Sequence, residues 1–141
     1  MNEEKRNIIL KHYRKPINYG LINDNAYIKV NSNNESCIDN IDMMVKIENE
    51  VIKDIRFEAE SCSISKSATS IMIETLLNKT ITEAIKIYNE YEKMILSKEY
   101  NEKILENAYV YSEIKNQPNR KKCALLPWHG IKKILNDIHN I

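Results

Sequence analysis

Residues 41–60 read IDMMVKIENEVIKDIRFEAE, a stretch in which apolar and polar side chains alternate along both halves. The apolar positions of this alternation are Ile41, Met43, Val45 and Ile47, followed by Ile55, Phe57 and Ala59. A period of two gives a strand one buried and one solvated face, as in an antiparallel sheet covered on one side. The segment Glu48-Asn49-Glu50 between the two runs is the expected hairpin turn. The stretch therefore predicts two adjacent antiparallel strands.

A third strand is predicted before this hairpin, where Ala26, Ile28 and Val30 alternate with polar neighbours. The apolar spacing becomes that of a helix in four other segments, residues 3–14, 61–78, 80–96 and 120–138. Thr80 and Glu83 predict a capping box. Residues 98–116 have a mixed period, which predicts a short helix and loops. Together these segments predict an α+β fold, a three-stranded antiparallel sheet with helices packed on one face.

Two proline residues help to predict where the first helix ends and where the last helix begins. Pro16 is expected to end the first helix, because the residue before a proline avoids the helical region. Pro127 is expected in the first turn or two of the last helix, or at the point where its regular part starts.

Length and composition restrict the class of protein. The 141 residues are the length of one domain, which we assign as residues 1–141. The 21 basic and 20 acidic residues balance, so no nucleic-acid partner is expected. The mixed charges of the first six residues are unlike a signal peptide, and no stretch approaches the roughly 20 apolar residues of a membrane span. Three widely spaced cysteines are an odd number, which favours a reducing cytoplasm over a disulfide framework.

Each of the three cysteines lies at the expected end of an element. Cys37 shares a polar connection with Asp39, Cys62 precedes a predicted helix, and Cys123 follows the basic residues 120–122. A helix N-terminus and a basic cluster both favour an anion, so we expect populated thiolates at Cys62 and Cys123. Three thiolates and one carboxylate suit a tetrahedral Zn²⁺, and thiolates also suit iron–sulfur clusters. The alternative for each cysteine is a small buried apolar side chain.

At these residues the chain resembles the IscU-like scaffold proteins of iron–sulfur cluster assembly, and in particular their SufU branch. Residues 12–20 (HYRKPINYG) are similar to the family's His-Tyr-x-x-Pro-x-Asn-x-Gly, and residues 34–39 (NESCID) to its Asn-Pro-x-Cys-Gly-Asp. Residues 57–65 (FEAESCSIS) are similar to Phe-x-Gly-x-Gly-Cys-x-Ile-Ser, and residues 120–128 (RKKCALLPW) to Arg-x-Lys-Cys-x-x-Leu-x-Trp. The chain departs from the family's Pro and Gly positions at Glu35, Ile38, Ala59 and Ser61.

The resemblance implies a Zn²⁺ ion held by Cys37, Asp39, Cys62 and Cys123, with Cys37 as the acceptor of persulfide sulfur. The sulfur donor would be a cysteine desulfurase of the SufS type. Downstream iron–sulfur assembly proteins would receive the sulfur from this chain, which is expected as a monomer or weak dimer. Such a protein is a sulfurtransferase-like relay partner rather than an independent enzyme.

Within this hypothesis, Asp39 is the weaker and more exchangeable ligand, which suits a site that must open to free Cys37. Arg120 and Lys122 are candidates for stabilising the thiolate or docking the desulfurase. Two alternatives use the same residues. One is a scaffold on which iron or a transient [2Fe–2S] cluster is assembled, and the other is an adaptor domain whose zinc only stabilises the fold.

Overall fold

The computed structural model describes residues 2–33 and 39–139 of the chain. Its elements follow in the order α1 (Glu3–Arg14), β1 (Ile28–Asn33), β2 (Asn40–Glu48), β3 (Val51–Glu60), α2 (Ser63–Leu76), α3 (Ile81–Ile95), the 3₁₀ helices η1 (Glu102–Tyr111) and η2 (Ile114–Asn116), and α4 (Pro118–His139). The strands form one antiparallel sheet in the order β1-β2-β3. The predicted α+β fold with a three-stranded antiparallel sheet is confirmed. Within the two described ranges, no helix is long and apolar enough to cross a membrane.

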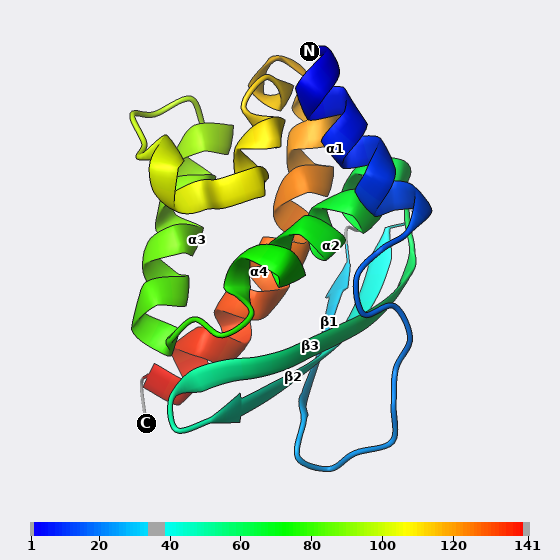
Figure 1. The fold of residues 1–141 in the computed structure, drawn as a ribbon, viewed down its shortest axis with the longest axis vertical. Helices are drawn as coiled ribbons and strands as arrows, with labels where there is room; N and C mark the ends of the chain where they lie inside the picture. The colour runs from blue at the N-terminus through cyan, green and yellow to red at the C-terminus, as the bar shows by residue number, and fades with distance from the viewer. Residues whose placement is uncertain (1, 34–38, 140–141) are drawn as a thin grey trace.

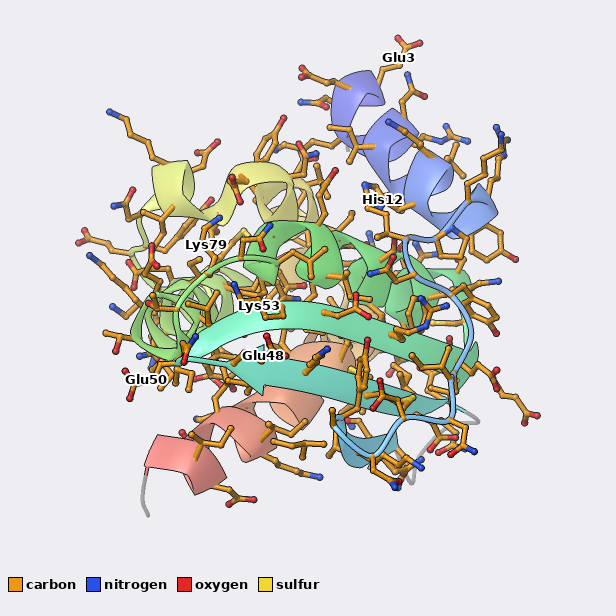
Figure 2. The ribbon with its side chains drawn as sticks, turned by 60° about the horizontal axis from the view of Figure 1, so that its bottom comes forward. Glu3, His12, Glu48, Glu50, Lys53 and Lys79 are labelled. Carbon is orange, nitrogen blue, oxygen red and sulfur yellow. The ribbon has the colours of Figure 1, made fainter. Side chains whose placement is uncertain are left out.

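The hairpin between β2 and β3 turns through Asn49 and Glu50. Their φ angles are 52° and 62°, and positive φ at both central residues is the requirement of the common two-residue hairpin turn. Figure 2 shows Glu48, Glu50 and Lys53 gathered at this end of the sheet. Asn40 pairs with Glu60 at the end of the hairpin opposite this turn.

A bulge in β3 changes which side chains reach the core. Lys46 of β2 pairs with Asp54, but the next residue, Ile47, pairs with Ile52. Lys53 is thus the extra residue, and the bulge reverses the alternation of β3 at that point. Ile52 and Ile55 are consequently both fully buried, at 0% exposure.

The first strand lies later in the chain than the alternation predicts. β1 begins at Ile28 instead of Ala26 and continues to Asn33. The expected core position Ile28 is 41% exposed, whereas Ser32 is 3% exposed. Ser32 Oγ donates a hydrogen bond to the carbonyl of Leu126 in α4 over 2.8 Å. This polar residue is buried because a helix carbonyl satisfies it, a pairing that strand periodicity does not reveal.

Helices α2 and α4 cover one face of the sheet, and α1 and α3 pack against these two (Figure 1). Residues 15–27 run along the outer edge of β3, where the backbone N–H of Gly20 donates to the Phe57 carbonyl over 2.7 Å. They then reach the other face, where the backbone N–H of Ile22 lies 3.4 Å from Met44 Sδ. Met44 is 1% exposed, so this loop gives the uncovered face of β2 a small apolar contact of its own.

The helix ends follow their capping residues. The predicted capping box is confirmed: Thr80 Oγ1 accepts the Glu83 backbone N–H over 3.1 Å, and Glu83 Oε1 accepts that of Thr80 over 3.0 Å.

Two expectations for the last helix, α4, were wrong. The last helix starts at Pro118 rather than residue 120, since proline suits a first helical position. Pro127 lies well inside that helix, not in its first two turns.

The segment of mixed period, residues 98–116, contains 3₁₀ helix in place of an α-helix. η1 has a kink at Glu106, whose φ of 50° and ψ of −131° are not helical. Leu105, Ala108, Val110 and Tyr111 are nonetheless fully buried. The 3₁₀ spacing of about three residues per turn explains why these apolar residues match neither the α-helical nor the strand period.

Candidate metal centre

Three segments that lie far apart in the sequence bring sulfur and carboxylate donors to the end of the sheet opposite the hairpin turn. Asp39 directly precedes β2, Cys62 lies between β3 and α2, and Cys123 lies in α4. Pairing of Asn40 with Glu60 places the start of β2 beside the end of β3. One donor atom from each of the three residues lies within 4.8 Å of the others, and Cys62 Sγ is 3.7 Å from Asp39 Oδ2.

Asp39 is a buried carboxylate, 2% exposed, with a donor at each oxygen. Its Oδ1 accepts the backbone N–H of Cys62 over 2.8 Å, and its Oδ2 accepts the hydroxyl of Ser65 over 2.8 Å. A buried carboxylate is costly without such partners. The two bonds therefore fix both the position and the plane of the Asp39 side chain.

Cys62 is the N-cap residue of α2. Its backbone is extended, with φ −68° and ψ 167°, and its Sγ lies 3.5 Å from the backbone N–H of Ser65. The unpaired N–H groups of a helix N-terminus favour negative charge. The start of α2 therefore points the sulfur of Cys62 toward Asp39, within reach of the Ser65 backbone N–H.

Cys123 is half-buried on α4, and its pKa differs from the sequence-based expectation. Burial, together with hydrogen bonding and negative charge at Asp39 and Cys62, raises the pKa of the Cys123 thiol well above its usual range. Arg120 and Lys122 do not offset this effect, since both are exposed to solvent in the turn before Cys123. The direction of this shift is opposite to the one expected from the basic residues 120–122.

The donor set fits a zinc ion. At the tetrahedral angle, bonds of about 2.3 Å to sulfur and about 2.1 Å to oxygen separate two zinc ligands by about 3.6–3.8 Å. Cys62 Sγ and Asp39 Oδ2 lie 3.7 Å apart, and all three donor atoms lie within 4.8 Å of one another, so small side-chain shifts bring them to that spacing. A divalent cation also offers the positive charge that two thiolates and a carboxylate need when they are held side by side. Asp39, Cys62 and Cys123 can therefore hold three of four tetrahedral positions.

The remaining predicted residues have different outcomes. Cys37, the expected fourth ligand, and Ile38 lie outside the described residues. Arg120 and Lys122 lie at the surface, on the same helix as Cys123. Ser65 contacts the centre but was missed from the sequence. Its signal was its place three residues after the N-cap Cys62, where a polar side chain often returns to the helix start.

Comparisons with known proteins give a consistent picture. The family described as NifU-like N-terminal domain matches residues 4–137 of the chain. The chain is 34% identical over 129 residues to the zinc-dependent sulfurtransferase SufU of Bacillus subtilis (strain 168), covering 91% of this chain and 86% of that protein. It is 36% identical over 115 residues to the iron–sulfur cluster assembly scaffold protein IscU of Thermotoga maritima, covering 82% of this chain and 81% of that protein.

A solved structure shares the fold over almost the whole chain. It is a candidate iron–sulfur cluster assembly scaffold protein for the SUF system, FiSufU, from Fervidobacterium islandicum AW-1. The two structures superpose with a TM-score of 0.87 at 32% sequence identity, and the match covers 96% of each chain.

Proposed function

Because this chain belongs to the family of NifU-like N-terminal domains, with SufU and IscU proteins among its relatives, we propose that it is a zinc-bound sulfur acceptor in iron–sulfur cluster assembly. The observation that carries the proposal is the convergence of Asp39, Cys62 and Cys123 from three separate segments. A structural zinc site is more often made of cysteine and histidine alone. The carboxylate ligand favours a site that opens.

Cys37 is the proposed acceptor, and it lies two residues before Asp39 in the sequence. A Zn²⁺ ion bound by Cys37, Asp39, Cys62 and Cys123 would keep the sulfurs deprotonated yet shielded. Asp39 is the ligand that tolerates rearrangement, while Cys62 and Cys123 retain their positions on α2 and α4.

The sulfur transfer is a thiol–persulfide exchange that needs no oxidant. The thiolate of Cys37 attacks the outer sulfur of the persulfide on a desulfurase cysteine. A new S–S bond forms at Cys37, the S–S bond of the desulfurase breaks, and the desulfurase cysteine leaves as a thiolate. Cys37 then carries the persulfide, which downstream iron–sulfur assembly proteins in the cytoplasm would receive by the same exchange.

The desulfurase would dock where the centre meets the surface. Arg120 and Lys122 are exposed in the turn of α4 just before Cys123, so their cationic groups can contact a partner there. We propose a partner of the SufS type for this surface. Exposed cations of this kind chiefly accelerate association, so their contribution falls as salt rises.

The test is to incubate the purified protein with a SufS-type desulfurase and L-cysteine, and to map modified cysteines by mass spectrometry. We expect one added sulfur atom on Cys37, one bound zinc per chain, and faster desulfurase turnover. The Cys37→Ala variant should accept no sulfur and should not accelerate the desulfurase. A Cys37→Ala variant that raises turnover as fully as the wild-type protein would refute the acceptor role.

A second function is favoured by the 36% identity to an IscU scaffold and by the thiol donors, which suit iron as well as zinc. In that case a [2Fe–2S] cluster would be assembled on the same residues and passed on. Anaerobic incubation with iron, sulfide and reductant distinguishes the two functions. Cluster absorbance with acid-labile sulfide, and no persulfide on the zinc form, would favour the scaffold over the sulfur acceptor.

A further inference from the structure

Ser65 contacts all three donor-bearing segments of the metal centre. It lies in the first turn of α2 and is completely buried, at 0% exposure. Its hydroxyl lies 2.8 Å from Asp39 Oδ2, 3.7 Å from Cys62 Sγ and 3.1 Å from the backbone carbonyl of Cys123. Ser65 is therefore placed to fix the relative positions of the three segments.

Pro127 explains why the carbonyl of Cys123 faces Ser65. In a regular α-helix the carbonyl of residue 123 accepts the N–H of residue 127, but proline has no N–H. The Cys123 carbonyl therefore lacks its helical donor inside α4. Ser65 supplies a donor from α2 in its place, which ties the backbone at Cys123 to the helix that begins at Cys62.

The Ser65 hydroxyl has one hydrogen and two acceptors in reach. It can share this hydrogen between Asp39 Oδ2 and the Cys123 carbonyl as a three-centre bond. The bond to the carboxylate is the shorter and the stronger, because hydrogen bonds to charged groups contribute about twice as much as neutral ones. Loss of the hydroxyl would leave both acceptors, each in a buried setting, without this donor.

We propose that Ser65 is a positioning residue of the metal centre: its hydroxyl holds Asp39 Oδ2 and the Cys123 backbone together so that the donors of three segments meet at one ion. This inference rests on the proposed metal centre but not on the sulfur transfer. Groups that hydrogen-bond a metal ligand typically change metal affinity by about 10- to 100-fold when they are removed. Ser65 is expected to have an effect of that size without touching the metal.

The test compares Ser65→Ala with Ser67→Ala by chelator competition for Zn²⁺. Ser67 is a matched control because it is on the same helix, is equally buried, and bonds Tyr111 Oη over 2.7 Å instead of any of the three donors. We expect Ser65→Ala to bind Zn²⁺ about 10- to 100-fold more weakly and to alter the visible absorption of bound Co²⁺, which reports ligand geometry. Ser67→Ala should resemble the wild-type protein in both measurements.

A further variant and the possible outcomes separate the role of Ser65 from the existence of the metal centre and from the sulfur transfer. Ser65→Thr keeps the hydroxyl and should recover most of the affinity, while thermal unfolding of each variant shows whether it still folds. Equal zinc affinity of Ser65→Ala and Ser67→Ala would overturn the role of Ser65. A wild-type protein that binds neither Zn²⁺ nor Co²⁺ would overturn both the centre and this role. Tight zinc binding without any sulfur on Cys37 would overturn the sulfur acceptor alone.

Discussion

Gly130 of α4 lies directly against Met43 of β2, with no room for a side chain between them. A Cβ atom at position 130 would stand 2.4 Å from Met43 Cε and 3.1 Å from Ser32 Cβ. The lack of a side chain lets α4 approach the sheet this closely. Because Cys123 lies two helical turns earlier on α4, the same contact helps to set the height of its thiol above the sheet.

We therefore predict that Gly130→Ala destabilises the protein. Overpacking costs about 1–3 kcal/mol, and the better helix propensity of alanine returns up to about 1 kcal/mol. The expected net loss is about 1 kcal/mol, measured by urea unfolding. Lys133→Ala, on the exposed side of the same helix, is the control and should change stability little. A Gly130→Ala variant more stable than the wild-type protein would contradict this account of the contact.

The sequence predicts most of the sheet and helices, since their periods are strong. Residues 41–60 have the alternation of a hairpin, and Thr80 with Glu83 has the pattern of a capping box. The period alone cannot reveal that Lys53 is bulged or that Met44 is covered by a loop on the other face. Those features depend on pairing partners and on residues far away in the chain.

The donors of the candidate centre could be suggested from the sequence because each has chemistry unusual for its place. Asp39 in a polar connection and Cys62 at a helix start are examples. Ser65 was missed, because its place three residues after Cys62 becomes informative only once Asp39 and Cys123 are located beside it. The thiol of Cys123 was misjudged for a related reason. Its nearest charges in space are anionic, although its neighbours in sequence are basic.

Backbone strain at Glu106 gives a second prediction. Its φ of 50° with ψ of −131° is a conformation that glycine adopts readily and other residues avoid, at a cost of about 1–3 kcal/mol. Glu106→Gly removes this strain but also the 3.7 Å ion pair with Lys79, which is worth about 0–1 kcal/mol at the surface. Glycine also makes the unfolded chain more flexible, at about 0.4–1 kcal/mol. We expect a net gain of up to about 1 kcal/mol in chemical unfolding.

Lys79→Ala is the control for Glu106→Gly, because it removes the same ion pair and leaves the backbone of residue 106 unchanged. It should be neutral or slightly destabilising. If Glu106→Gly loses more stability than Lys79→Ala, the backbone at residue 106 is not strained.

Removal of the metal gives a third prediction. The fully buried core contains Phe57, Ile71 and Trp128, none of which donates to the centre. Asp39 keeps its bonds from Cys62 and Ser65 without an ion. A chelator should therefore leave the far-ultraviolet circular dichroism unchanged and lower the melting temperature. Added zinc should restore the melting temperature in a concentration-dependent way. Each tenfold rise in the zinc concentration above the dissociation constant adds about 1.4 kcal/mol to the free energy of unfolding. Unfolding on chelation would instead favour a purely structural zinc.

The last prediction concerns the buried His12, which joins α1 to α2 and which Figure 2 shows at the C-terminal part of α1. It is 4% exposed, with Nδ1 at 2.7 Å from Ser70 Oγ and Nε2 at 3.5 Å from Glu74 Oε2. Ser70 Oγ also accepts the backbone N–H of Ile17 over 2.8 Å. Burial lowers the pKa of His12 below its usual 6.5, Glu74 raises it by less, and Lys11 adds to the lowering. The ring is therefore neutral in the folded protein at pH 7.

Because the unfolded chain binds a proton at His12 near pH 6.5 and the folded protein only at lower pH, the unfolded state holds more protons between the two pKa values. Above pH 6.5 the ring is neutral in both states and the free energy of unfolding is not reduced by His12. As the pH falls below 6.5 this free energy declines, and the decline ends below the pKa of His12 in the folded protein. We expect His12→Gln to be less stable at neutral pH, from the altered bonds, but to lose less further stability on acidification. Urea unfolding at a series of pH values measures this slope.

His129→Gln is the control. The pKa of His129 is also lowered by burial, yet its side chain is 48% exposed, and the decline in stability due to His12 should remain in this variant. An unchanged pH slope in His12→Gln would show that the neutral ring of His12 is not a source of the acid sensitivity.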